Sequence, residues 1–248
     1  MEVHAHSHTE RKKWYHYMWE FLMLFLAVFC GFLAENQREH YVEKNRAREY
    51  IRSMLEDLKS DTAGLTHQIE RRETAKGIYD TLIHLLNQPQ RTESEQQRLY
   101  YLGRVALYYI DFMQINDRTY DQMKSSGNLR LIHNKDVAAT ISKYYLNSKD
   151  IEANRSQTLI RLQAVIEMEG KVFNGAVFQE MTDMDAFTFK PPTGNPPLMT
   201  EDKALINELT LRLHYVISIA SFTKNYMKSL RKEATELISL LQKDYNPE

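Results

Sequence analysis

Apolar residues recur at intervals of three and four along most of this chain, which is the spacing that places them on one face of an α-helix. The longest such pattern follows Ala34 and continues towards Pro89, the first proline in the sequence. The stripe of this predicted helix consists of Ala47, Ile51, Leu55, Leu58, Leu65, Ile69, Tyr79, Leu82 and Leu86. Apolar residues are sparse between Ala34 and Ala47, so we expect a solvated stalk there and a packed helix after it.

A second helix is predicted to begin beside Thr92 and Glu95, because these residues have the spacing of a capping box. Its apolar face is expected to extend as far as Met113. Asn116 can then cap a short third helix, which Gly127 can end in a left-handed conformation. The sequence therefore predicts two shorter helices after the long one.

Two more long helices are predicted in the rest of the chain. Asn134 can cap a helix that extends as far as Phe178, and Thr200 can cap the last one. Between them, residues 179–199 contain four prolines and no periodic pattern, which is typical of a functional or mobile loop. The whole pattern predicts an all-α fold, in which an N-terminal transmembrane helix continues into a long helix that joins an antiparallel bundle of about four helices.

The stretch Trp14–Ala34 is typical of a membrane segment, and it carries no charge or amide from Phe21 to its end. Its apolar part is shorter than the roughly 20 residues that a membrane-spanning helix needs. Aromatic and basic residues extend it on the N-terminal side, as expected at a membrane interface: Trp14, Tyr15, Tyr17, Trp19, Arg11, Lys12 and Lys13. We therefore expect a tail at residues 1–13, a transmembrane anchor at 14–35 and an α-helical bundle domain at 36–248.

The anchor predicts a single-pass protein of the inner (cytoplasmic) membrane. Basic residues flank it on both sides, but the compact cluster at residues 11–13 favours a cytoplasmic N-terminus and a bundle domain outside that membrane. A cleaved signal peptide is the alternative, with Ala34 as the last residue before the cut. Phe32 does not fit the pattern of small residues that such a cleavage site requires.

Composition narrows the classes of function. The formal net charge is −1, so the chain lacks the basic footprint of a nucleic-acid-binding protein. The single cysteine, Cys30, lies inside the apolar segment. The bundle domain is therefore expected to contain neither an internal disulfide nor a thiolate metal site.

Spacing motifs for catalysis are missing from the sequence. A di-iron bundle needs Glu-x-x-His on two helices, and this chain contains no such pair, nor H-E-x-x-H, G-x-S-x-G or G-x-G-x-x-G. We therefore predict that the protein is not an enzyme and has no catalytic, cofactor-binding or metal site. His4, His6 and His8 could bind a divalent metal weakly, but a mobile tail beside a membrane is the stronger explanation for them.

Three segments resemble a family of uncharacterised bacterial single-pass membrane proteins, which is defined only as a domain of unknown function. They are WEFLMLFLAVFCGFLAEN in the anchor, EYIRSMLEDLKSDT after the stalk, and TYDQMKSSGNLRLIHN with its SSGNLRLI connector. The likeness covers about the first 150 residues. It implies membrane location and a helical fold, and it carries no known catalytic residues.

The first functional hypothesis is a non-enzymatic, membrane-anchored bundle that acts in envelope structure, signalling or protein interaction. Ala27, Gly31 and Ala34 form a small-xxx-small face that lets two membrane helices approach closely. This face predicts a homo-oligomer formed through the membrane and stalk helices, with the lipid bilayer and an unidentified protein as further partners.

The second hypothesis is a ligand-binding sensor or an unrecognised enzyme. Its pocket would lie between helices, under the 179–199 loop, and tyrosines of the second predicted helix would line it. These tyrosines are Tyr100, Tyr101, Tyr108 and Tyr109. A position at the border between core and solvent is the commoner use of such tyrosines.

Overall fold

The structure is a computed structural model that describes residues 13–245 of the chain. Its elements in chain order are α1 (Trp14–Asn87), α2 (Glu93–Val105), η1 (Ala106–Tyr109), α3 (Arg118–Ser125), η2 (Asn128–Leu131), α4 (Lys135–Val172), α5 (Gly175–Glu180), β1 (Thr182–Asp183), β2 (Thr188–Phe189) and α6 (Lys203–Tyr245). The strands β1 and β2 form a small antiparallel pair. The all-α prediction is confirmed, and so is the long first helix.

The chain divides into two compact units, Met1–Glu49 and Tyr50–Glu248. In the first unit, every side chain of residues 14–34 is exposed. An 18-residue window of α1 has a mean hydropathy of 1.9 and no buried residue. By length and composition alone, this part of α1 is therefore able to cross a membrane.

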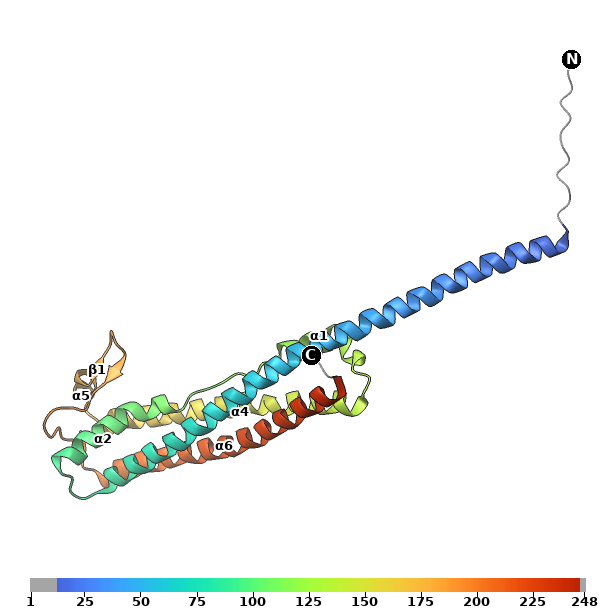
Figure 1. Cartoon of the computed structure of the whole chain (residues 1–248). Helices are drawn as coiled ribbons and strands as arrows, with labels where there is room; N and C mark the ends of the chain where they lie inside the picture. The colour runs from blue at the N-terminus through green and yellow to red at the C-terminus, as the bar shows by residue number, and fades with distance from the viewer. Residues whose placement is uncertain (1–12, 246–248) are drawn as a thin grey trace, which may run out of the picture. The chain divides into compact units, whose positions relative to one another are not determined.

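The second unit is a helical bundle in which successive passes of the chain run in opposite directions (Figure 1). The first pass is α1 from Tyr50, the second runs from α2 to α3, and the third and fourth are α4 and α6. The helices α4 and α6 pack against each other. Each long helix forms because its apolar residues return to the same face every three or four positions.

Two apolar cores fill the bundle. The core at the α3 end includes Ile51, Met54, Leu58, Leu65, Tyr144, Leu230 and Leu237. The core at the α2 end includes Tyr79, Leu82, Leu99, Tyr100, Val165, Met168 and Leu213. Buried polar residues lie along the helices where the two cores meet: Gln68 and Arg72 on α1, Thr158 on α4 and Thr223 on α6.

The second pass of the bundle differs from the prediction. The expected helix through Met113 ends at Val105, and η1 and a stretch without regular structure at residues 110–117 follow it. Asn116 does not cap α3, because its side-chain and backbone N–H groups donate to Asp61 on α1. Half of this pass is therefore fixed by polar contacts with α1, which local sequence spacing does not reveal.

The loop expected at residues 179–199 contains structure of its own. The helix α5 and the β1–β2 hairpin lie at one end of the bundle (Figure 1). The Pro-rich part is held by α2, because Gln96 donates to the carbonyl of Pro196 at 2.7 Å and Tyr100 donates to that of Pro197 at 2.7 Å. The excursion is therefore attached to the bundle rather than free of it.

Helix boundaries show which capping predictions were right. The capping box of Thr92 and Glu95 is present, Asn134 caps α4, and Gly127 has a φ of 70°. The prediction that Thr200 caps the last helix was wrong. The backbone N–H of Asp202 donates to the Thr200 hydroxyl, and the Asp202 carboxylate accepts from the first turn of α6.

Candidate functional site

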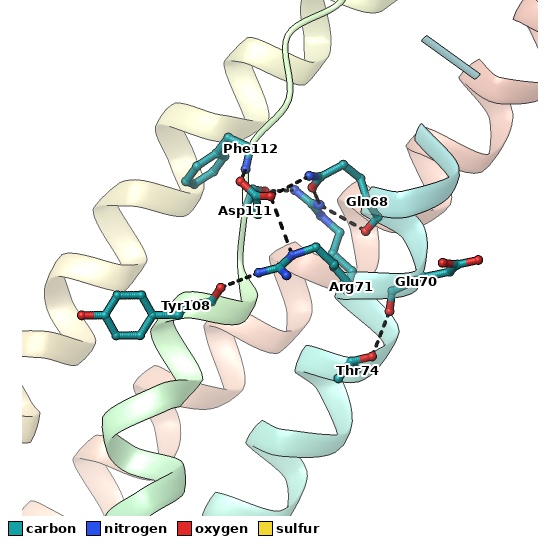
Figure 2. A network of polar contacts seen from close by, with 8 residues as sticks. Gln68, Glu70, Arg71, Thr74, Tyr108, Asp111 and Phe112 are labelled. Atoms are coloured by element: carbon teal, nitrogen blue, oxygen red, sulfur yellow. Dashed lines mark hydrogen bonds and ion pairs between the residues drawn. The ribbon is translucent and has the colours of Figure 1, made fainter. Parts of the chain in front are cut away.

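Polar side chains of α1 hold the irregular part of the second pass in place, and Figure 2 shows the first group of them. Arg71 donates to the backbone carbonyl of Tyr108 at 2.6 Å, and Gln68 donates to the carboxylate of Asp111 at 3.2 Å. Arg72 donates to the backbone carbonyl of Asp111 at 3.1 Å. These contacts give hydrogen-bond donors to backbone carbonyls of η1 and of the irregular stretch after it.

The buried charge in this group is balanced locally. Burial lowers the pKa of Arg72 to about 10, and the neighbouring carboxylate of Asp111 opposes the decrease. The guanidinium therefore stays charged at neutral pH. Gln68 accepts from it at 2.5 Å. We interpret this network as support for the fold, because its members bind one another and the backbone of the second pass, although the Nε atoms of Arg71 and Arg72 have no hydrogen-bond partner among the described residues.

A second group of polar contacts lies nearer the α3 end. The carboxylate of Asp61 accepts from the backbone and side chain of Asn116 and, at 3.0 Å, from the hydroxyl of Tyr144. The hydroxyl of Thr119 donates to Asp57. Burial raises the pKa of Asp61, and the hydrogen bonds from Asn116 and Tyr144 oppose this rise. Both carboxylates have partners within the fold, so we interpret them as structural.

A cleft of about 420 Å³ lies at the α2 end of the bundle. Its walls come from α2, η1, α4 and α5, and its lining residues are Gly103, Arg104, Leu107, Tyr108, Ile166, Glu169, Gly170, Phe173, Gly175 and Phe178. The close approach of Phe173 to α2 depends on Gly103, because a Cβ there would lie 2.8 Å from the ring. Most of the side chains that line the cleft are apolar or aromatic, and two, Arg104 and Glu169, are ionisable.

Glu169 is the unusual residue of the cleft. Its side chain is on α4, and the residue is only 6% exposed. Its Oε1 atom has no hydrogen-bond partner among the described residues. Burial raises the pKa of this carboxyl to about 8, although the positive charge of Arg104 opposes the increase. The group is therefore mainly a neutral acid at pH 7, able to donate one hydrogen bond.

Arg104 faces the same cleft from α2 and is surrounded by aromatic rings. Its guanidinium carbon lies 4.7 Å from the ring centroid of Phe189, 5.6 Å from that of Tyr108 and 6.0 Å from that of Phe178. Its Nε donates to the hydroxyl of Thr182 at 3.2 Å and its Nη1 to that of Tyr108 at 3.1 Å. These contacts orient the cation without neutralising it, because every partner is uncharged.

The position of Glu169 in the sequence indicates that its side chain is buried, although the sequence prediction did not include it. Glu169 lies seven residues after Leu162 and four after Val165, both of which are buried. It therefore occupies a position on the apolar stripe of α4, where an acidic residue is rare unless it has a partner or a function. Its neighbours Glu167 and Gly170 make the segment look exposed. Of the four tyrosines expected at a pocket, Tyr108 lines the cleft and Tyr100 is buried in the core.

The predicted membrane-helix association face lies in the first unit. Ala27, Gly31 and Ala34 are all exposed, and a Cβ added at Gly31 would meet no described atom within 4 Å. The face is therefore open in a single chain, and association through it stays a prediction. Between residues 13 and 245, no group of three or more His, Cys, Asp or Glu side chains could hold a metal ion. His4, His6 and His8 lie outside the described residues.

Comparison with protein-family models, with curated proteins and with solved structures gave no match. The resemblance to a family of bacterial membrane proteins therefore stays a prediction. The cleft and the exposed apolar part of α1 are the features of the molecule that bear on function.

Proposed function

We propose that this protein is a membrane-anchored helical bundle that acts without catalysis in envelope structure, signalling or protein interaction. One observation carries the proposal: the apolar residues of α1 from Trp14 to Ala34 are all exposed. An exposed apolar surface of this length is costly in water and stable in a bilayer. The location that fits is the inner membrane, crossed once, with the lipid bilayer as the first partner.

Membrane extraction tests the anchor. Full-length protein should stay in membranes washed with alkaline carbonate, and its intact mass should include residues 14–34. The double variant Phe25→Lys with Phe29→Lys places two charges in the apolar segment and should release the protein, since each charge disfavours insertion by roughly 3 kcal/mol. The matched variant Tyr41→Lys with Val42→Lys changes exposed residues beyond the segment and should not. Release of the unaltered protein, or a mass that lacks the segment, would contradict the anchor.

We place the bundle domain outside the inner membrane, because the basic cluster at residues 11–13 favours a cytoplasmic N-terminus. Replacing Cys30 with Ala removes the single cysteine. Ser126→Cys then adds one at an exposed position after α3. A maleimide that cannot cross membranes should label it in intact spheroplasts. Labelling only after lysis would reverse the orientation.

We also propose that two copies associate through Ala27, Gly31 and Ala34, on the support of the small-xxx-small spacing alone. Crosslinking in native membranes should yield a dimer, and Gly31→Ile should reduce its amount severalfold. Val28→Ile is the matched control, because it adds a methylene on the same helix outside that face. Equal crosslinking of the two variants would exclude the pairing.

A ligand-binding sensor is the second candidate function. The cleft beside Glu169 favours it, because it is lined by apolar side chains, Arg104 and Glu169, and the buried Oε1 atom of Glu169 has no partner among the described residues. Ligand sites in proteins commonly combine an apolar wall with a few polar groups that converge. No residue that lines this cleft lies within 179–199, the loop under which the sequence predicted a pocket, but Thr182 and Phe189 of that loop contact Arg104.

A further inference from the structure

Five residues set the chemistry of the cleft at the α2 end. Leu107, Ile166 and Phe173 offer apolar surface, while Arg104 and Glu169 offer polar groups from opposite helices. A larger hollow of about 560 Å³ lies beside residues 113–117 and α4. Exposed charged side chains line much of that hollow, and every buried polar atom without a partner among the described residues lies elsewhere. The cleft beside Glu169 is therefore the stronger site.

We propose that this cleft binds an apolar monocarboxylate, with the ligand carboxylate held by Arg104 and Glu169 and its apolar body against Leu107, Ile166 and Phe173. The proposal rests on the second candidate function, a ligand-binding sensor. It adds the chemical class of the ligand to it.

Arg104 supplies the charge that selects an anion. Thr182 and Tyr108 accept from two of its N–H groups, and a guanidinium has five such donors. The remaining donors are available to a carboxylate, which matches the planar guanidinium geometry. The rings of Tyr108, Phe178 and Phe189 reduce the access of water to the cation and leave its charge in place.

Glu169 supplies a proton donor opposite the cation. A neutral carboxyl donates a short, charge-assisted hydrogen bond to a carboxylate. Glu169 lines the cleft, and its Oε1 atom has no competing partner among the described residues. The titratable groups that face Glu169 are Arg104 from α2 and Tyr79 from α1. Burial raises the pKa of Tyr79, so its hydroxyl stays neutral. Among the described residues, Arg104 therefore supplies the charge that acts on Glu169, and Tyr79 adds none.

Other ligand classes fit less well. A cationic ligand would be repelled by Arg104 and would meet a carboxyl that is mainly neutral at pH 7. A metal ion would require several ligating side chains, and the described residues do not gather three of them anywhere. A volume of about 420 Å³ is within the range of small-molecule sites and suits an aromatic acid.

The test uses full-length protein in lipid nanodiscs and para-trifluoromethylbenzoate as the probe, followed by fluorine NMR. Empty nanodiscs correct for partition into lipid. The acid should bind more tightly than its amide, alcohol and amine analogues by roughly tenfold or more, because only the acid accepts from both groups with full charge. Its affinity should fall roughly tenfold between about pH 7 and pH 9, since ionised Glu169 repels the carboxylate.

Variants locate the binding. Arg104→Met should weaken binding of the acid at least tenfold, whereas Arg98→Met, on an exposed position of the same helix, should leave it unchanged. Glu169→Gln should retain binding and lose the pH dependence, because an amide also donates. Gly170→Leu adds a side chain where a Cβ would meet no described atom within 4 Å. Because the added side chain has space, this variant should fold and its leucine should block the cleft. Loss of binding in this variant would then result from the blocked cleft and not from unfolding.

The outcomes separate the two levels of the proposal. If the amide, alcohol or amine binds as tightly as the acid, the cleft is a ligand site and the carboxylate class is wrong. If none of the probes binds, both the ligand class and the sensor function are wrong. If the acid binds to the Arg104→Met and Gly170→Leu variants as tightly as to the unaltered protein, its site lies elsewhere and the proposal fails.

Discussion

Asp61 and Glu169 are both carboxylates inside the same bundle, and they have opposite surroundings. Asp61 is 1% exposed and accepts three hydrogen bonds, two from Asn116 and one from Tyr144. Glu169 is 6% exposed, and its buried Oε1 has no partner among the described residues. Burial raises both pKa values. The two carboxyl groups differ in their hydrogen bonds: Asp61 has donors within the fold, and Oε1 of Glu169 has none among the described residues.

The comparison separates support from binding. At the α3 end, Asp61 accepts two hydrogen bonds from Asn116, in the segment at residues 110–117, and a third from Tyr144 on α4. At the α2 end, the fold leaves part of the capacity of Glu169 unused beside a cleft. An unsatisfied buried polar group lowers stability. Other such atoms occur in the bundle, and the position of Glu169 beside a cleft is what supports the proposed ligand.

The largest expected effect comes from removing the satisfied carboxylate. Asp61→Ala leaves two N–H groups of Asn116 and the buried Tyr144 hydroxyl without their acceptor, and it should lower the free energy of unfolding by about 3 kcal/mol. Urea unfolding of the full-length protein in detergent, followed by circular dichroism, measures the loss. Asp121→Ala on the exposed face of α3 is the control and should change the value by less than about 0.5 kcal/mol. Equal effects would mean that the hydrogen bonds of Asp61 do not stabilise the bundle.

The unsatisfied carboxyl should instead produce a pH dependence. The pKa of Glu169 is raised by burial from 4.5 to about 8, so the folded state holds a proton that the unfolded state releases in this window. The stabilising contribution of that proton is complete below about pH 4.5 and is lost as the pH rises towards 8. Glu169→Gln should remove this trend and be more stable than the unaltered protein by roughly 2 kcal/mol at the upper end. Parallel stability curves from about pH 5 to 8 would show that Glu169 is not protonated in the fold.

The difference between the two carboxylates could not be predicted from the sequence, although most of the helices could. The three-and-four spacing and the capping box of Thr92 and Glu95 located α1 and α2, because these signals are local. The role of Asp61 depends on Asn116, which is 55 residues away. Local spacing instead suggested that Asn116 caps α3. The carboxylate captures it because a buried acceptor needs donors wherever they lie in the chain.

The cleft was only partly predictable for the same reason. The pattern of residues 179–199 indicated an excursion, and the nearby tyrosines indicated a pocket wall. The cation–aromatic group around Arg104 combines α2, α5 and β2, which are separated by up to about 85 positions in the chain. Two apolar residues of α4, Leu159 and Ile166, are exposed rather than buried. Ile166 lines the cleft instead.

The smallest expected effects come from two glycines on facing walls of the cleft, and they test whether its shape is built as described. A Cβ at Gly103 would lie 2.8 Å from the Phe173 ring, whereas one at Gly170 would meet no described atom within 4 Å. Gly103→Ala should therefore destabilise the protein by about 1–2 kcal/mol through overpacking. Gly170→Ala should stabilise it by about 0.5–1 kcal/mol, because alanine favours the helix. The same urea experiment measures both, and each variant is the control for the other. If both variants change the free energy of unfolding in the same direction, Phe173 does not pack closely against α2 at Gly103. The cleft wall beside Glu169 would then be less tightly packed than described.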